Sequence, residues 1–391
     1  MAHIFLASPH MSDEGYEKEY IKEAFDTNWI APLGKNVNEF EKEMKEYLGC
    51  QSAVALSAGT AAIHLALKSI GIKQGDIVFC QSLTFSASAN PITYEKAIPV
   101  FIDSDKDNWN MSPEALKKAF EVYKDNLPKA VIVVHLYGMS AKIDEIKNIC
   151  QEYNVPLIED AAESLGTIYK GQYTGTFGDY GIISFNGNKI ITSSGGGMIL
   201  VNAENAEEKA KKILYWSTQA RDAARHYQHT EIGYNYRMSN IVAGIGRGQL
   251  KVLNQRIEQK RAIYSYYKEA FKDIEDIEMM PLSDDERSNC WLSSIQLKPD
   301  SKVKPLDIMV ALEENDIESR PIWKPMHLQP VFHDCDFITT AEDVTISNEE
   351  IGSDTSYSGQ LFEHGVCLPS DTKMTMDDLE RITTIIKGLW K

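Results

Sequence analysis

The sequence predicts an α/β protein in which a large, mostly parallel sheet domain is followed by a smaller C-terminal α+β domain. Along roughly the first 245 residues, short apolar runs alternate with amphipathic segments, and a long charged helix and mixed elements then follow. A chain of 391 residues also exceeds the size that one simple core usually supports. We therefore expect a large domain over residues 1–248 and a small domain over residues 249–391.

The large domain is predicted from repeated strand–turn–helix units. Residues 52–72 (SAVALSAGTAAIHLALKSIGI) predict a short strand, a turn of small residues and an amphipathic helix, and residues 76–97 repeat that order. Further strands are expected within 98–103, 129–138 and 155–164, with helices from about residue 112 and over 141–154. Continuous apolar strands separated by helices are typical of a parallel sheet covered on both faces.

The small domain is predicted from a change of pattern. Residues 248–274 predict one long, charged, amphipathic helix of the kind that links two domains. The segments 290–297, 305–317 and 318–332, followed by a final helix over 375–390, together indicate a smaller α+β domain.

Composition excludes several classes of partner. The net charge of −17 opposes binding to nucleic acid, because phosphate backbones recruit basic surfaces. The six cysteines are scattered and form no C-x-x-C pair, so we expect neither a zinc site nor a disulfide framework and favour a reducing cytoplasm. No apolar run reaches the ~18 residues of a membrane helix, and no signal peptide is recognised, so we expect no membrane partner.

Polar residues gather where the predicted strands end, which is the ligand-binding edge of such a sheet. In SAGTAAIHLAL, free backbone amides at a helix start and the Thr60 hydroxyl could bind a phosphate, although a plain helix cap is an alternative. The strand LIEDAAES places Asp160 at the same edge. A buried carboxylate needs a partner, and a protonated pyridine nitrogen is one such partner. A metal ion is another, but no His cluster of suitable spacing accompanies Asp160. The simpler alternative is that Asp160 caps the N-terminus of a helix.

A single lysine, Lys189, stands in the nearly uncharged run SFNGNKIITSSGGGM, and three glycines follow it. Loss of hydration favours a neutral, nucleophilic amine, whereas a solvated loop lysine is the alternative. Lys189, Asp160 and the anion-binding turn together fit pyridoxal phosphate: the lysine forms a Schiff base, the aspartate holds the pyridine nitrogen protonated and the turn holds the phosphate. Phe85 could stack on the ring, or it could be a core residue.

Ten motifs in one order carry a resemblance that runs nearly from end to end. They are NWIAPLG, SAGTAAIHLAL, LTFSASANPI, PVFIDSD, HLYG, IEDAAESLG, TFGDYGIISFNGNKIITSSGGGM, GYNYRMSN, RPIWKPMH and GVCLPS. The chain resembles the DegT/DnrJ/StrS-type aminotransferases that act on nucleotide-linked keto sugars. The resemblance implies the fold type I of pyridoxal phosphate-dependent transferases, as in aspartate aminotransferase. It is closest to members that aminate UDP-linked 4-keto-6-deoxy-N-acetylglucosamine for bacillosamine-type glycans and exopolysaccharide.

The resemblance also implies roles for individual residues. Lys189 matches the lysine that bonds to the cofactor and shuttles the proton, Asp160 the acid at the pyridine nitrogen, and Phe85 the aromatic stacked on the ring. Phosphate contacts are implied for Gly59, Thr60 and Ser184, and for Asn235 from the neighbouring subunit. Asn235 therefore implies a homodimer with shared active sites.

Other positions match the family less specifically. Glu163, where the family often has Gln, lies near the cofactor, and its role stays open. The substrate side is expected to include Arg221, Arg237, Trp323 and His327, with surface salt bridges as the alternative for the charged ones.

The predicted reaction moves the amino group of glutamate to the sugar ketone in two half-reactions, with ping-pong kinetics. Related sugar dehydratases carry histidine in place of the lysine, so Lys189 argues against that activity. A non-catalytic, cofactor-bound regulator and an amino-acid aminotransferase of the same fold are the remaining alternatives.

Overall fold

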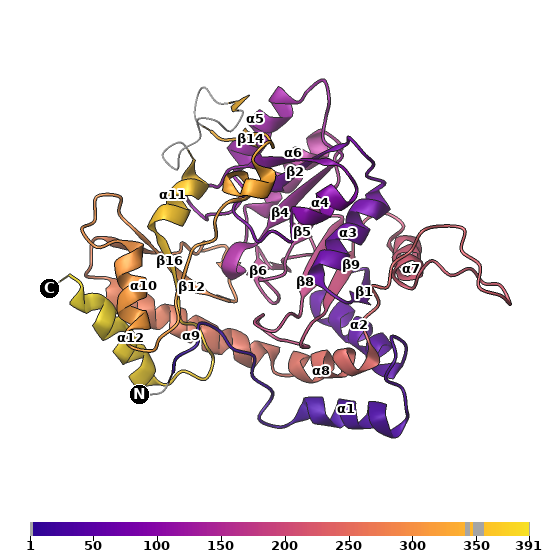
Figure 1. Ribbon diagram of the computed structural model, residues 1–391, viewed down its shortest axis with the longest axis horizontal. Helices are drawn as coiled ribbons and strands as arrows, with labels where there is room; N and C mark the ends of the chain where they lie inside the picture. The colour runs from indigo at the N-terminus through magenta and orange to yellow at the C-terminus, as the bar shows by residue number, and fades with distance from the viewer. Residues whose placement is uncertain (1–2, 341–344, 347–355, 391) are drawn as a thin grey trace.

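The computed structural model describes residues 3–340, 345–346 and 356–390. Its centre is a nine-stranded sheet with the order β1-β9-β8-β5-β4-β2-β3-β14-β15 (Figure 1). Every pairing from β8 to β14 is parallel, whereas β1 with β9, β9 with β8 and β14 with β15 pair antiparallel. The prediction of a mostly parallel sheet is confirmed. The strands are β1 (Ser52–Leu56), β2 (Ile77–Gln81), β3 (Ile98–Ile102), β4 (Ala130–Val134), β5 (Leu157–Asp160), β8 (Tyr180–Ser184), β9 (Gly197–Val201), β14 (Phe337–Ile338) and β15 (Thr345–Ile346).

The central strands are buried on both faces because helices cover each side. Successive residues of β2 pack into two different apolar clusters, Val78 into a first cluster and Phe79 into a second. The first cluster includes α3 (Gly59–Ile70), and the second includes α5 (Pro113–Val122) and α6 (Ile143–Glu152). Strands that need apolar side chains on both faces read as continuous apolar runs, which is the pattern seen in the sequence. The short α4 (Asn90–Tyr94) and α7 (Ala206–Ser217) complete this part.

The long helix expected over residues 248–274 is two helices, α8 (Asn240–Leu250) and α9 (Leu253–Phe271). They are separated at Val252, whose φ of −106° and ψ of 6° leave the helical range. The start of α8 was missed because Gly244, Gly246 and Gly248 weaken a helical pattern. Those glycines let α8 pack closely: a Cβ at Gly246 would lie 2.6 Å from the Phe40 ring of α2 (Lys35–Leu48), and one at Gly248 would lie 2.5 Å from the Glu17 nitrogen of α1 (Tyr16–Asp26).

A second sheet, β10-β12-β16-β13, is antiparallel and forms the centre of the C-terminal part. Figure 1 shows α9 running from α8 toward this part, where α10 and α12 lie. The elements are β10 (Ile277–Met279), β12 (Ser293–Leu297), α10 (Pro305–Glu313), β13 (Arg320–Pro321), α11 (Tyr357–His364), β16 (Gly365–Leu368) and α12 (Met376–Gly388). Near the N-terminus, Ile4 bridges to Ile317 and packs in the same apolar cluster. The division at residues 248 and 249 stays a prediction.

Short elements join the two parts. They are the three-stranded sheet of β11 (Glu286–Arg287), β6 (Ile168–Tyr169) and β7 (Gln172–Tyr173), and the 3-10 turns η1 (Leu136–Gly138), η2 (Met326–Leu328) and η3 (Pro330–Phe332).

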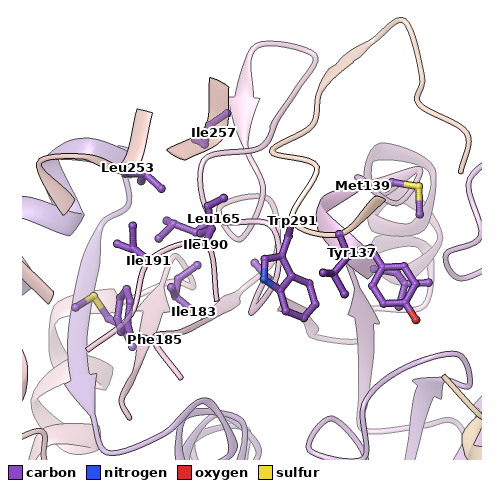
Figure 2. Close-up of a cluster of buried hydrophobic side chains, with 14 of the residues drawn as sticks. Tyr137, Met139, Leu165, Ile183, Phe185, Ile190, Ile191, Leu253, Ile257 and Trp291 are labelled. Carbon is purple, nitrogen blue, oxygen red and sulfur yellow. The ribbon is translucent and has the colours of Figure 1, made fainter. Parts of the chain in front are cut away.

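An apolar cluster supports the loop that carries Lys189. Figure 2 shows Phe185, Ile190 and Ile191 of this loop beside Ile183, with Leu253 of α9 nearby. Trp291 and Tyr137 belong to the same cluster (Figure 2). Apolar side chains on both sides of Lys189 therefore fix the loop to the core, although the lysine itself is polar.

No helix within the described residues is long and apolar enough to cross a membrane. The six cysteines form no disulfide, and the described part of the chain holds no group of three or more His, Cys, Asp or Glu suited to a metal ion.

Candidate active site

A cavity of about 590 Å³ lies at the carboxyl ends of the parallel strands, between the large sheet and the C-terminal part. Eight of the predicted site residues line it: Gly59, Thr60, Phe85, Asp160, Glu163, Ser184, Lys189 and Trp323. Residues more than 250 positions apart in the sequence therefore share one cavity.

One end of the cavity is the N-terminus of α3. Ala58, which precedes the helix, is extended and provides no side-chain cap, so the first amides of the helix, at Gly59 and Thr60, have no capping side chain. Ser184, at the end of β8, lies so close that a Cβ at Gly59 would sit 3.5 Å from its Cβ. Free amides, the helix dipole and the hydroxyls of Thr60 and Ser184 form an environment suited to a phosphate group.

The glycine run after Lys189 permits this arrangement. A Cβ at Gly197, the first residue of β9, would lie 2.4 Å from the Ala58 carbonyl carbon and the Gly59 nitrogen. A Cβ at Gly196, which has a φ of +141°, would lie 2.7 Å from the Ser193 hydroxyl. The run lets the chain pass directly against the turn that opens α3.

Asp160 is a buried carboxylate at the end of β5. Its Oδ2 accepts a hydrogen bond from the Ser88 hydroxyl at 2.6 Å, and its Oδ1 accepts one from the Ala162 amide at 3.2 Å. It makes no ion pair with any described residue, so a cationic group in the cavity would supply the missing partner.

The nearly uncharged run around Lys189 suggested uncharged surroundings, and this prediction is wrong. Its Nζ lies 3.3 Å from Oε1 of Glu163 and 4.2 Å from the centroid of the Trp291 ring, and its side chain is 12% exposed. The charge comes from a residue 26 positions earlier, which local composition cannot show. The amine therefore lies between a carboxylate and an indole face.

Glu163 is itself buried, and its Oε2 accepts a hydrogen bond from the Tyr137 amide at 2.7 Å. Burial raises the pKa of the Glu163 carboxyl, while the charge of Lys189 and the Tyr137 amide act in the opposite direction. The balance leaves the Glu163 pKa above its ordinary value.

Phe85 and Trp323 form an aromatic wall. Phe85 is 58% exposed and lines the cavity, so it is not a core residue. Its ring centroid lies 5.6 Å from that of Trp323, whose backbone amide donates to the Tyr137 hydroxyl at 3.1 Å. A planar ring in the cavity could stack on Phe85.

Four predicted site residues do not line this cavity. Arg237 is buried in an ion pair with Glu41 and donates to the Ala55 carbonyl at 3.1 Å, so it is not the surface salt bridge that the sequence left as an alternative. Arg221 lies outside the cavity with its guanidinium 4.4 Å from the centroid of the Tyr227 ring. Asn235 is exposed and bridges to Thr218.

His327 is the fourth, and it lies behind the cavity wall. Its ring stacks on Phe337 with a centroid distance of 3.7 Å, and its Nδ1 shares a hydrogen bond of 2.6 Å with the Ser82 hydroxyl. Burial lowers the pKa of His327 to about 3, so the imidazole is neutral. A contact between His327 and substrate is absent from this geometry because the ring is enclosed by protein.

Several cavity residues were missed from the sequence. Trp291 lies next to the lysine amine, and its indole Nε1 donates to the Asn188 carbonyl at 2.7 Å. Glu318 and Arg320 reach the cavity from the C-terminal part, and Leu6 and Ala7 from the N-terminal segment. The motif RPIWKPMH contains Arg320 and could have drawn attention to it, whereas nothing local marks Trp291.

Comparison with known proteins identifies the family. Residues 12–387 match the model of the DegT/DnrJ/EryC1/StrS aminotransferase family. The chain belongs to this family. It is 53% identical over 389 residues (99% of this chain and 96% of the other) to Bacillus subtilis EpsN, which is named as a pyridoxal phosphate-dependent aminotransferase. It is 34% identical over 382 residues (96% of each) to a GDP-perosamine synthase of Vibrio cholerae.

The solved structures agree. A DegT/DnrJ/EryC1/StrS aminotransferase from Brucella abortus superposes with a TM-score of 0.85 at 28% identity, covering 96% of this chain and 95% of that one. The predicted fold of the family is thereby confirmed.

The chain is a pyridoxal phosphate-dependent sugar aminotransferase of this family. Its own residues fit that cofactor: uncapped amides at α3 for the phosphate, an Asp160 carboxylate without an ion-pair partner for the pyridinium, and a primary amine at Lys189.

Proposed function

We propose that the chain transfers the amino group of glutamate to the 4-keto carbon of a nucleotide-linked 4-keto-6-deoxy sugar, UDP-4-keto-6-deoxy-N-acetylglucosamine in particular, for polysaccharide synthesis. The observation that carries the proposal is the convergence of Lys189, Asp160 and the uncapped start of α3 on one cavity. Those groups are 29 or more positions apart in the sequence, and a structural role for each separately would not require them to meet.

The chain's own residues divide the work. Bound pyridoxal phosphate supplies an electron sink that makes a carbon-bound proton of the substrate acidic. Asp160 keeps a positive charge on the ring nitrogen, and the amides of Gly59 and Thr60 fix the phosphate end. The Lys189 amine would take up the acidic carbon-bound proton of the substrate and give a proton back at the carbon where the reaction requires it, a role that typically contributes about 10²–10⁴-fold in rate.

The cavity suits a substrate larger than glutamate. Its volume of about 590 Å³ is in the range of pockets that enclose drug-sized ligands. Apart from Lys189, Arg320 is the one Lys or Arg among the described lining residues, and it is 59% exposed at the side chain. An accessible guanidinium at this rim is suited to a carboxylate or a diphosphate, and both substrates carry such groups.

We also propose a homodimer in which Asn235 contributes to the partner's cavity. Residues 221–235 form a loop that extends from α7 away from the sheet (Figure 1). Tyr227 and Ile232 on this loop are 78% and 77% exposed, and surface apolar residues of this size favour a protein contact. In its own subunit Asn235 does not line the cavity, so a role at a phosphate would require a second copy.

Mixed dimers test the shared site. Lys189→Ala and Asn235→Ala homodimers are each expected to be inactive. When the two variants are mixed, dissociated and reassembled, half of the dimers are mixed, and each mixed dimer has one intact site. The mixture is therefore expected to regain up to a quarter of wild-type activity. Absence of recovery, with mixed dimers verified by mass, would overturn the shared site.

A substrate panel tests the reaction. Glutamate with UDP-4-keto-6-deoxy-N-acetylglucosamine is expected to give an amino sugar nucleotide by mass spectrometry, with 2-oxoglutarate in equal amount. A GDP-linked 4-keto-6-deoxy sugar is the second candidate substrate, because the Vibrio cholerae relative is named a GDP-perosamine synthase. A preference for this sugar would change the proposed nucleotide from UDP to GDP but leave the proposed reaction unchanged. Transfer only to 2-oxo acids would favour an amino-acid aminotransferase. A cytoplasmic location is part of the proposal, in line with six cysteines that form no disulfide.

A further inference from the structure

The amine of Lys189 has two close neighbours that belong to distant parts of the chain. Oε1 of Glu163 lies 3.3 Å from Nζ, and the ring of Trp291 lies on its other side at 4.2 Å from the centroid. Glu163 is 3% exposed and Trp291 is 2% exposed. The carboxylate and the amine therefore face each other at the wall of the cavity, with the indole also close to the amine.

The orientation of Glu163 is fixed. Its Oε2 accepts from the Tyr137 amide at 2.7 Å, which leaves Oε1 directed at Lys189. Tyr137 holds a φ of 54°, a left-handed backbone conformation that non-glycine residues seldom adopt, and its ring is fully buried. A strained, enclosed residue thus aims the carboxyl group at the amine.

Within the part of the chain that the structure describes, Lys189, Asp160, Tyr137 and Cys367 are the titratable groups that interact with Glu163 most strongly. Lys189 is the one cation in this set, whereas Asp160 adds a like charge that disfavours a second carboxylate. Burial, together with the Asp160 charge, keeps the pKa of Glu163 above its ordinary value, which makes its carboxylate a better proton acceptor.

We propose that Glu163 is the proton partner of Lys189. The Glu163 carboxylate accepts a proton from the Nζ ammonium before the Lys189 amine acts as a nucleophile, and it returns the proton afterwards. The N–H bond at Nζ breaks as an O–H bond forms at Oε1, so no other reactant is needed. The inference rests on the proposed assignment of Lys189 as the lysine that bonds to the cofactor. An amide at this position could accept a hydrogen bond but could not take up the proton, so Glu163 and Gln differ in chemistry and scarcely in size.

Competitive labelling of the cofactor-free protein tests the pair. A trace amine reagent is applied from pH 7 to pH 10.5, and Lys189 is quantified by mass spectrometry in wild type, Glu163→Gln and Glu163→Asp. In wild type and Glu163→Asp the labelling of Lys189 is expected to change by less than about threefold between pH 7 and pH 9, because transfer of the proton from Nζ to the carboxylate exposes a neutral amine without loss of a proton from the pair. In Glu163→Gln the amine can lose its proton only to solvent, so its labelling is expected to rise by about tenfold per pH unit over the same range.

Two controls separate chemistry from packing. Lys142, which pairs with Asp105 and Asp107 away from the cavity, is expected to label equally in all three proteins. If Glu163→Gln merely opened the cavity, labelling of Lys189 would rise by the same factor at every pH. That result, with wild-type labelling as steep in pH as that of Glu163→Gln, would overturn the proposal.

Reductive trapping tests the underlying assignment separately. Pyridoxal phosphate and borohydride are expected to attach a pyridoxyl group to the Lys189 peptide in both wild type and Glu163→Gln. Attachment to a different lysine would refute the assignment of Lys189 in the proposed function, even where the labelling shows that the pair shares a proton.

Discussion

Trp291 is expected to hold the Lys189 loop in place, and a single substitution can measure this. The indole is 2% exposed, and its Nε1 donates to the Asn188 carbonyl at 2.7 Å. Trp291→Phe keeps an aromatic face but leaves that carbonyl without its donor, which is expected to cost about 1–3 kcal/mol in the free energy of unfolding. Trp291→Ala also empties the space of a large buried ring and is expected to cost about 3–5 kcal/mol.

Guanidinium unfolding followed by far-ultraviolet circular dichroism measures these losses without relying on tryptophan fluorescence. Trp323→Phe is the matched control, because Trp323 also lines the cavity but its indole nitrogen makes no hydrogen bond to a described residue. It is expected to cost about 1 kcal/mol or less. Equal losses for Trp291→Phe and Trp323→Phe would refute the role given to the hydrogen bond at Asn188.

Three further predictions follow from the site and its surroundings. Lys189→Ala is expected to fold with the wild-type circular dichroism spectrum but to lose turnover in the product assay; steady transamination by that variant would contradict its role. His327 is held neutral in the folded protein with a pKa of about 3, whereas its pKa in the unfolded chain is about 6.5. As the pH falls below about 6.5, the unfolded chain therefore takes up a proton before the folded protein does. The free energy of unfolding of the wild type is expected to fall by about 2 kcal/mol between pH 7 and pH 5 from this group. Unfolding titrations at both pH values should show a smaller loss in His327→Asn, and an identical loss would count against the buried neutral imidazole. Gly197→Ala is expected to disturb the start of α3 and to weaken cofactor binding in absorbance titrations. Gly388→Ala, at the end of α12 and outside the cavity lining, would place a Cβ with nothing within 4 Å and is expected to bind the cofactor normally; equal affinities of the two variants would contradict the close approach.

The sequence predicts the parallel sheet well because each central strand is buried on both faces and reads as a continuous apolar run, as Ile77–Gln81 does. It fails where tertiary packing overrides local preference. Gly244, Gly246 and Gly248 weaken a helical pattern, yet α8 forms because they let it lie against α1 and α2.

The site divides in the same way. Gly59, Asp160 and Lys189 stand at the ends of strands or in distinctive local runs, and the motifs identify them. The surroundings of Lys189 could not be predicted, because Glu163 and Trp291 reach the amine only through the fold. Arg237 and His327 show the converse, because each stands in a family motif but neither side chain lines the cavity. Arg237 pairs with Glu41, and His327 stacks on Phe337.

The first half of an amino transfer from glutamate can be observed in the visible absorbance spectrum of the purified protein loaded with pyridoxal phosphate, recorded before and after glutamate. A visible band is expected to bleach with glutamate and to return when a nucleotide-linked keto sugar is added, and no such change is expected in Lys189→Ala. A protein that shows no band after loading, or a band that glutamate leaves unchanged, would contradict the proposed reaction.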